Sequence, residues 1–249
     1  MDRAALDAAY NNGAAVPGSA EIVAEWRRRS DILRASSKEL RYGSADRNRI
    51  DYFEAKAGAP LLVFIHGGYW QNREKETFGF LAAGPLAHGI SVALLGYTLA
   101  PEKRLDGIVA EVRAALDFLA RPLVVSGWSA GGHLTAMMMD HPNVRGGLAI
   151  SGIFDLAPIR LCYLNEKLRL DEDEARRNSP ILVSFIEKPL VVAYGTSELP
   201  ELQRQSKEYA ARFGHRLLPL AGHDHFSLLE ELASPRGALT AAVRTLVDT

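Results

Sequence analysis

Short apolar runs alternate with longer amphipathic stretches over most of this chain. Apolar residues return at helical spacing over 105–120 and 198–213, and residues 235–247 form a similar closing pattern. The runs between such stretches have the length of strands and occupy residues 61–65, 91–95, 122–126, 147–151, 189–194 and 216–220. Continuous apolar strands that alternate with helices are typical of a parallel sheet covered by helices on both faces. The pattern therefore predicts an α/β fold with a mostly parallel central sheet.

The first sixty residues follow a different pattern. Helical periodicity over 3–9 and 19–36 indicates an N-terminal helical extension, about residues 1–38, ahead of the sheet. Residues 40–42 and 49–53 alternate between apolar and polar positions, and a turn sequence with glycine separates them. This alternation predicts an antiparallel hairpin at one edge of the sheet.

Composition agrees with one well-packed domain. The chain has 249 residues, of which 47% are hydrophobic and 24% charged, and its net charge is -1. A chain of this length can bury a substantial core as a single unit. Residues 155–188 carry only a short charged helical pattern, which is too small for a separate cap domain. We expect a single domain over residues 1–249, without a large cap.

The same features argue against several classes of protein. Basic residues are dispersed, so we expect no positive surface of the size that nucleic acid requires. No apolar segment approaches the roughly 20 residues of a membrane helix. The one cysteine, Cys162, cannot form an internal disulfide, and the first residues lack the apolar core of a signal peptide. We therefore expect a cytoplasmic protein that binds neither nucleic acid nor membrane.

A candidate nucleophile lies at the end of one predicted strand. Residues 127–131 read Gly-Trp-Ser-Ala-Gly, directly after an apolar run and directly before a helical stretch. In a G-x-S-x-G motif placed in this way, the serine occupies a strained turn, and the glycines let strand and helix pass closely enough to expose its hydroxyl. Ser129 is therefore the expected nucleophile, and its hydroxyl requires a base and an orienting acid.

The acid is expected in a loop after a late strand. Glu198 follows the run that ends at Tyr194, at the carboxyl end of a sheet strand, where a side chain can reach the serine. Asp155, just past the preceding strand, is a competing carboxylate, and Glu201 is a third, further into the next helix. We take Glu198 as the acid.

The base is expected after the last strand. His223 and His225 both lie in the loop that follows residues 216–220, and we favour His225 because it is nearer the next helix. A His-x-His sequence also suits a metal ion, but no third ligand follows at a recognisable spacing. We expect neither a metal nor a cofactor.

Donors for the negative charge that develops on the substrate oxygen are expected from two places. The backbone N–H after the nucleophile belongs to Ala130. The sequence His66-Gly67-Gly68-Tyr69-Trp70 follows another apolar run, and its glycines allow the chain to turn N–H groups toward Ser129. Gly68 and Tyr69 are the expected donors, with Gly67 as an alternative.

Side chains beside these elements have expected roles of their own. His66 should brace its loop by hydrogen bonding and not act as a base. Trp128, Tyr69 and Trp70 stand next to the predicted catalytic elements, so they are candidates to line a pocket for a flat or apolar substrate, although core packing is the commoner place for tryptophan.

The motifs together resemble the arylformamidase (kynurenine formamidase) branch of the α/β-hydrolases, and the resemblance runs from about Leu61 to Glu231. That branch has the motifs H-G-G-x-W, S-A-G-x-H-L and D-H-F, which are similar to residues 66–70, 129–134 and 224–226 here, and its acid loop resembles residues 198–206. Two residues differ from those usual in the branch, since Trp128 stands where histidine is more frequent and Glu198 where aspartate is usual.

The resemblance implies an α/β-hydrolase fold and a serine hydrolase that cleaves a small acyl group from an aryl formamide or ester through an acyl-enzyme. Its partner would be a small-molecule acyl substrate, and a homodimer is an expectation from fold analogy alone. Two alternatives stay open. One is a general short-chain carboxylesterase or arylesterase without a formamidase role, and the other is a non-catalytic scaffold.

Overall fold

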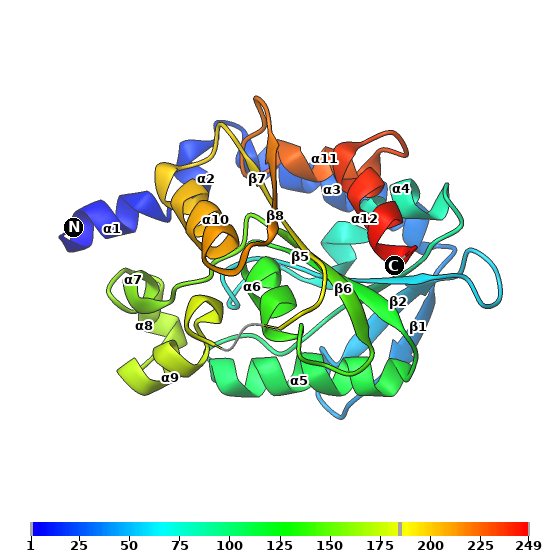
Figure 1. Ribbon diagram of the computed structural model, residues 1–249, viewed down its shortest axis with the longest axis horizontal. Helices are drawn as coiled ribbons and strands as arrows, with labels where there is room; N and C mark the ends of the chain where they lie inside the picture. The colour runs from blue at the N-terminus through cyan, green and yellow to red at the C-terminus, as the bar shows by residue number, and fades with distance from the viewer. Residues whose placement is uncertain (1, 184–185, 249) are drawn as a thin grey trace.

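A computed structural model describes residues 2–183 and 186–248 (Figure 1). Its centre is an eight-stranded sheet with the strand order β1-β2-β4-β3-β5-β6-β7-β8. β1 pairs with β2 and β2 with β4 in antiparallel fashion, and all pairs from β4 to β8 are parallel. The strands are Lys38–Arg41 (β1), Arg49–Phe53 (β2), Leu61–Ile65 (β3), Ser91–Leu95 (β4), Leu123–Trp128 (β5), Val144–Ile150 (β6), Leu190–Gly195 (β7) and Arg216–Leu220 (β8). The predicted α/β fold, its mostly parallel sheet and its edge hairpin are confirmed.

Helices cover both faces of the sheet (Figure 1). The two faces have separate cores, because successive residues of a buried strand point to opposite sides: Leu61, Val63 and Ile65 of β3 belong to one cluster, and Leu62 and Phe64 to the other.

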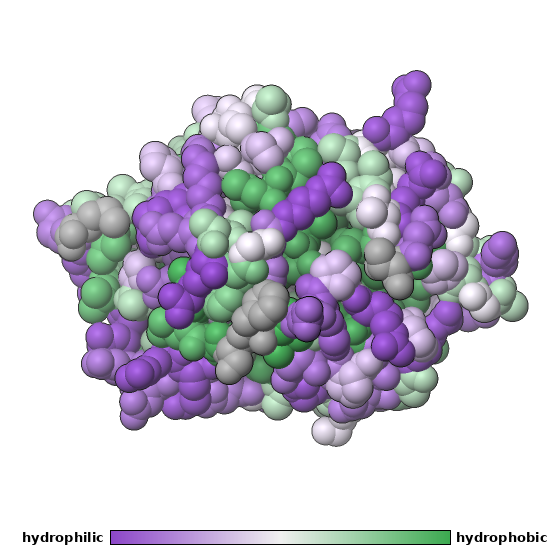
Figure 2. Space-filling view, in the orientation of Figure 1, coloured by the Kyte–Doolittle hydropathy of each residue, from purple (hydrophilic) through white to green (hydrophobic). Residues whose placement is uncertain are grey.

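Helical segments of the first core and the loops around it are Arg3–Ala9 (α1), Leu105–Leu119 (α5), Ala130–Met137 (α6), Ala157–Arg160 (α7), Asn165–Leu168 (α8), Glu172–Arg177 (α9), Pro180–Leu182 (η2) and Pro200–Phe213 (α10). Those of the second core are Ser19–Arg34 (α3), Lys75–Ala82 (η1), Ala83–Leu86 (α4), Ser227–Leu229 (η3), Glu230–Ala233 (α11) and Ala238–Val247 (α12). The short α2, Asn12–Ala15, connects α1 and α3. Figure 2 shows hydrophilic side chains around much of the outline, with apolar ones visible between them toward the middle of this face.

Several element boundaries differ from the predicted ones, for local reasons. The helix expected from residue 198 begins at Pro200, because the Glu198 N–H donates to the Gly195 oxygen in a turn and Leu199, with a ψ of 138°, is not helical. The closing helix begins at Ala238 and not at residue 235, because residues 234–237 form a turn in which Gly237 packs directly on the Glu231 backbone. Residues 155–183 hold three short α-helices where one was expected.

The elements are ordinary in length for a parallel α/β sheet. Within residues 2–183 and 186–248, no helix has the length and apolar character needed to cross a bilayer.

Candidate active site

Ser129 occupies a sharp turn between β5 and α6. Its φ and ψ are 58° and -117°, a conformation that side-chain-bearing residues rarely adopt. A Cβ on Gly127 would lie 2.3 Å from the Gly131 oxygen, and a Cβ on Gly131 would lie 1.9 Å from the Ile65 oxygen. Only glycine fits at these two positions, so the G-x-S-x-G sequence is a steric requirement of the turn that presents the serine.

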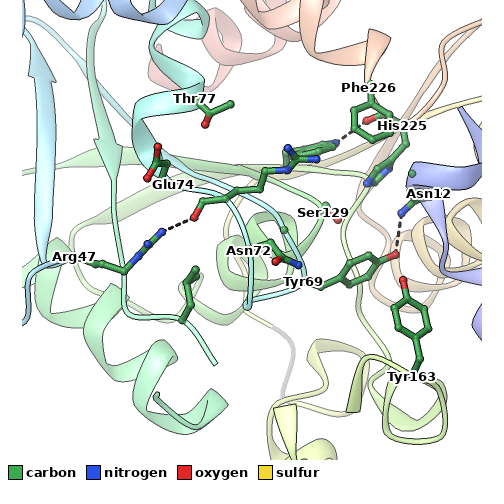
Figure 3. Close-up of a pocket in the computed structure, with 15 residues that line it drawn as sticks. Asn12, Arg47, Tyr69, Asn72, Glu74, Thr77, Ser129, Tyr163, His225 and Phe226 are labelled. Carbon is green, nitrogen blue, oxygen red and sulfur yellow. Dashed lines mark hydrogen bonds between the residues drawn. The ribbon is translucent and has the colours of Figure 1, made fainter. Parts of the chain in front are cut away.

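Glu198 and His225 form a buried pair at the carboxyl end of the sheet. The imidazole Nδ1 lies 3.2 Å from Glu198 Oε2. Because a carboxylate only accepts hydrogen bonds, Nδ1 carries the proton and Nε2 is left as the acceptor. Ser129 and His225 line the same cavity, as Figure 3 shows. The structure thus brings Glu198 to His225, and His225 to the cavity that Ser129 lines.

Glu198 is held by donors of its own. Its Oε1 accepts a hydrogen bond from the Gly195 N–H at 2.8 Å and another from the Ser151 hydroxyl. Ser151 was not singled out from the sequence, although its position directly after β6 is a signal that could have found it. Its φ of 48° is positive, as is that of Ser129.

The competing residues have other partners. Asp155 accepts from the Ala157 N–H at 3.0 Å, and Glu201 is bound by Arg204 and by the Tyr10 hydroxyl. His223 lies 3.6 Å from Glu231, outside the cavity lining. The structure thus separates Asp155, Glu201 and His223 from the pair that faces Ser129.

The loop after β3 presses against the nucleophile. A Cβ on Gly67 would lie 2.6 Å from the Trp128 oxygen and 3.0 Å from the Ser129 Cβ, so the loop backbone passes directly over the serine. Gly68 has a φ of 108°, and the N–H groups of Gln71 and Asn72 both donate to its oxygen. Ala130 is the first residue of α6, and the first N–H groups of a helix have no acceptor within it. Gly67 and Ala130 are thus next to Ser129, and Gly68 and Tyr69 line the same cavity.

His66 braces this loop. Its Nδ1 donates to the Gly67 oxygen at 2.7 Å, and its ring stacks on Tyr97 at 4.3 Å between centroids. Burial lowers the pKa of His66 to about 4, so the imidazole is neutral at physiological pH. These contacts agree with a supporting residue and not with the base.

Trp70 does not lie where the sequence analysis placed it. Its side chain is fully buried, and its indole N–H donates to His133 Nδ1 at 3.3 Å, while His133 Nε2 donates to the Asn178 oxygen. Trp70 is absent from the cavity lining, so the expectation of a pocket residue is wrong. A positive φ of 58° turns its side chain under the loop and into the first core.

Trp128 has two contacts with the candidate base. The indole N–H donates to the His225 main-chain oxygen at 2.8 Å, and the two rings lie 4.9 Å apart. Trp128 and Tyr69 both line the cavity, as expected from the sequence.

The cavity above Ser129 has a volume of about 680 Å³ (Figure 3). Its walls combine aromatic, polar and charged side chains with three glycine or leucine positions. The lining residues are Asn12, Gly13, Arg47, Gly68, Tyr69, Asn72, Arg73, Glu74, Thr77, Leu99, Trp128, Ser129, Tyr163, His225 and Phe226. A cavity of this size accommodates a small aromatic substrate.

The N-terminal extension completes one wall. The Tyr69 hydroxyl donates to the Tyr10 oxygen at 2.6 Å and accepts from Asn12 Nδ2 at 2.8 Å, and the Tyr10 hydroxyl donates to Glu201. No periodicity in the sequence marks Asn12 as a site residue, because its role depends on where α1 and α2 pack. Among the described residues, no group of three or more His, Cys, Asp or Glu is placed to hold a metal ion.

Known proteins are similar to this chain over much of its length. The family model BD-FAE matches residues 52–212. A kynurenine formamidase of Danio rerio is 31% identical over 84% of this chain and 81% of its own length, and one of Salmo salar is 33% identical over 77% and 75%.

Solved structures of hydrolases are also similar to this chain. A proposed thioesterase from Silicibacter sp. TM1040 superposes with a TM-score of 0.91 at 32% identity, covering 96% of this chain and 98% of that one. An esterase of Pyrobaculum calidifontis, at 18% identity and a TM-score of 0.73, shares the fold. The chain is therefore a hydrolase of the α/β-hydrolase fold and belongs to the BD-FAE family, in the branch that contains the kynurenine formamidases.

Proposed function

We propose that this hydrolase removes a small acyl group from an aryl formamide or aryl ester through Ser129, His225 and Glu198. The observation that carries the proposal is the buried His225–Glu198 pair, whose imidazole lines the same cavity as a serine held in a strained turn. Nucleophile, base and orienting acid are the groups that acyl transfer by serine requires.

In the first half of the reaction, Ser129 Oγ attacks the acyl carbon while His225 Nε2 takes the hydroxyl proton. Glu198 holds Nδ1–H of the imidazole and stabilises the imidazolium that forms. The N–H groups of Ala130, Gly68 and Tyr69 donate hydrogen bonds to the negatively charged substrate oxygen, with Gly67 as an alternative donor.

The tetrahedral intermediate then expels its leaving group. An aromatic amine must be protonated as it departs, and His225 returns the proton it took; a phenolate leaves more easily. Water, activated by the same imidazole, hydrolyses the acyl-enzyme and restores Ser129. Proton transfer and charge stabilisation come from side chains and backbone, so the scheme uses no metal or cofactor.

The immediate surroundings of Ser129 favour a small acyl group and an aromatic leaving group. A single carbon added to Gly67 would lie 2.6 Å from the Trp128 oxygen and 3.0 Å from the Ser129 Cβ, so the loop after β3 leaves little room on this side of the serine. Tyr69, Trp128 and Phe226 supply aromatic walls. The relatives named kynurenine formamidase make N-formylkynurenine the first aryl formamide to test.

A second candidate is a general short-chain carboxylesterase or arylesterase. Trp128 favours it, because this indole replaces the histidine more frequent in the formamidase branch and reshapes the wall next to the serine. The catalytic steps are the same for both candidates. They differ in the leaving group that the cavity accepts.

Steady-state kinetics on N-formylkynurenine and 4-nitrophenyl acetate separate the candidates, with the Ser129→Ala variant as control. The proposal expects turnover of both substrates by the wild type and of neither by the variant. Turnover of the ester alone would leave the esterase candidate. No turnover of either, without labelling of Ser129 by a fluorophosphonate, would favour the scaffold.

A further inference from the structure

Two arginines line the cavity without a carboxylate partner. In the part of the chain that the structure describes, neither Arg47 nor Arg73 forms a salt bridge. Glu74 is the one acidic residue in the lining, and it is paired with Arg27 of α3. The cavity therefore has excess positive charge, which is unusual for a site that accepts only neutral substrates.

Arg73 lies close to the start of the loop after β3, which carries the candidate donors Gly68 and Tyr69. A Cβ on Gly68 would meet the Arg73 Cγ at 2.7 Å, so the aliphatic stem of the arginine packs directly on the loop backbone. A Cβ on the neighbouring Gly67 would likewise lie 3.0 Å from the Ser129 Cβ, so the same loop packs against the serine. The stem of Arg73 thus packs on Gly68, which is adjacent to the Gly67 backbone that lies over the nucleophile.

The backbone of Arg73 is fixed by its neighbour in the lining. Arg73 has a φ of 75°, in the left-handed region that arginine rarely occupies. Arg47 Nη2 donates to the Arg73 main-chain oxygen, and Arg47 Nε donates to the Tyr97 oxygen at 3.1 Å. Arg47 therefore donates to main-chain oxygens and holds Arg73 in place. Among the described residues, the Arg73 guanidinium has no hydrogen-bond acceptor.

An unpaired, partly buried guanidinium has a cost in free energy. Burial lowers the pKa of Arg73, and no acidic neighbour opposes that effect. The group nevertheless keeps its charge at neutral pH, because arginine does not deprotonate in proteins. An anion that enters the cavity would restore the lost hydrogen bonds and offset the desolvation.

We propose that Arg73 is a specificity-determining residue that binds a carboxylate on the substrate. This inference rests on the proposed function and narrows its substrate class to acyl compounds with an anionic group outside the scissile bond. In Figure 3, Arg47 and Glu74 lie on one side of Ser129, and Asn12 and Tyr163 on the other. Arg73 lines the same cavity as these residues and as Ser129, so a carboxylate bound to its guanidinium belongs to the molecule that Ser129 attacks.

Phenyl acetate and the three acetoxybenzoate isomers test this assignment, because they share an acyl group and differ by one carboxylate at three positions. We expect the wild type to show a lower KM for at least one isomer than for phenyl acetate. Arg73→Gln should raise that KM by about 10- to 100-fold, the range of a charged hydrogen bond, and change the KM of phenyl acetate less than about twofold. Arg73→Lys, which keeps the charge, should recover part of the loss.

Two controls keep the result unambiguous. Arg244→Gln removes the same charge from an exposed position on α12 and should leave all four KM values unchanged. Thermal unfolding of each variant shows whether the fold is intact. Equal changes for charged and neutral esters in a folded Arg73→Gln protein, or no change for either, would overturn the inference.

Benzoate binding, measured by calorimetry on Ser129→Ala protein with and without Arg73→Gln, separates this inference from the proposed function. Benzoate affinity that falls at least about 10-fold with the arginine supports the carboxylate site even if no ester is hydrolysed. If the wild type hydrolyses esters and Arg73→Gln leaves the benzoate affinity unchanged, the inference is contradicted and the proposed function stays intact.

Discussion

Trp128 and His225 are joined by a hydrogen bond from the indole N–H to the histidine main-chain oxygen, 2.8 Å long. The residue before the candidate nucleophile therefore fixes the loop that carries the candidate base. A single side chain links the two ends of the proposed proton transfer, and it does so through the main chain, so the imidazole itself stays free to face the cavity.

Trp128→Phe tests this link. The variant keeps an aromatic wall but leaves the buried His225 oxygen without its donor, which should cost about 1–3 kcal/mol of folding free energy. Because the loop is then less well positioned, kcat should fall about 10-fold or more. Urea unfolding and steady-state kinetics on 4-nitrophenyl acetate measure both effects.

Trp26→Phe is the matched control, since Trp26 packs on the Trp128 ring at 5.7 Å but is absent from the cavity lining. It should reduce stability with a smaller effect on kcat. Equal kcat values for Trp128→Phe and the wild type would contradict the role given to the indole.

Glu198→Gln should lower kcat by about 10³- to 10⁴-fold, as loss of the orienting carboxylate does in serine hydrolases. The amide can donate to Nδ1 and so favours the imidazole tautomer in which Nε2 carries the proton and cannot accept another. Kinetics at neutral pH measure the loss. Glu198→Asp, which retains a carboxylate, should be much more active, and Glu201→Gln, which changes a carboxylate bound to Arg204, should lose less than about tenfold.

Two buried histidines predict a dependence of stability on pH. Burial lowers the pKa values of His66 and His133 to about 4 in the folded protein, against about 6.5 when unfolded. Below pH 6.5 the unfolded chain binds more protons at these sites, so stability is complete above that pH and is lost as the pH falls toward 4. The two groups together should contribute up to about 2.7 kcal/mol per pH unit within this window.

Urea unfolding at several pH values between 7 and 4.5 measures this slope. In His133→Gln, the contribution of one histidine is removed, so the slope should become shallower by up to about 1.4 kcal/mol per pH unit. An unchanged slope would mean that His133 is not buried in its neutral form.

Gly131→Ala should prevent the turn that presents Ser129 from forming. The added carbon would lie 1.9 Å from the Ile65 oxygen, and because backbone on both sides is fixed by the sheet, we expect a loss of at least about 3 kcal/mol and no measurable activity. Gly58→Ala, at a φ of 75° but in open space, should cost only about 1–2 kcal/mol from backbone strain and keep full activity. Circular dichroism and thermal unfolding compare the two.

The sequence predicted those elements whose position depends on a single local requirement, such as burial or backbone sterics. Buried parallel strands need continuous apolar runs, so β3 and β4 were predicted at their observed residues. The turn that presents Ser129 was equally predictable, because the close backbone contacts at Gly127 and Gly131 leave room for glycine only.

Other features depend on packing between distant segments. The choice among Glu198, Asp155 and Glu201 is made by partners such as Ser151 and Tyr10, which no local pattern connects to them. Trp70 was misplaced because an aromatic residue in a loop can turn to either side, and its backbone conformation decides which. The contribution of Asn12 to the cavity wall was missed for the same reason.

The central claim is that His225 activates Ser129, and covalent labelling tests it most directly. Folded protein is treated with a fluorophosphonate, and the modified peptide is identified by mass spectrometry. We predict one adduct at Ser129 in the wild type, formed at least about 10²-fold more slowly in His225→Ala, because the hydroxyl then has no base. Absence of an adduct at Ser129, or a labelling rate that His225→Ala leaves unchanged, would contradict the account.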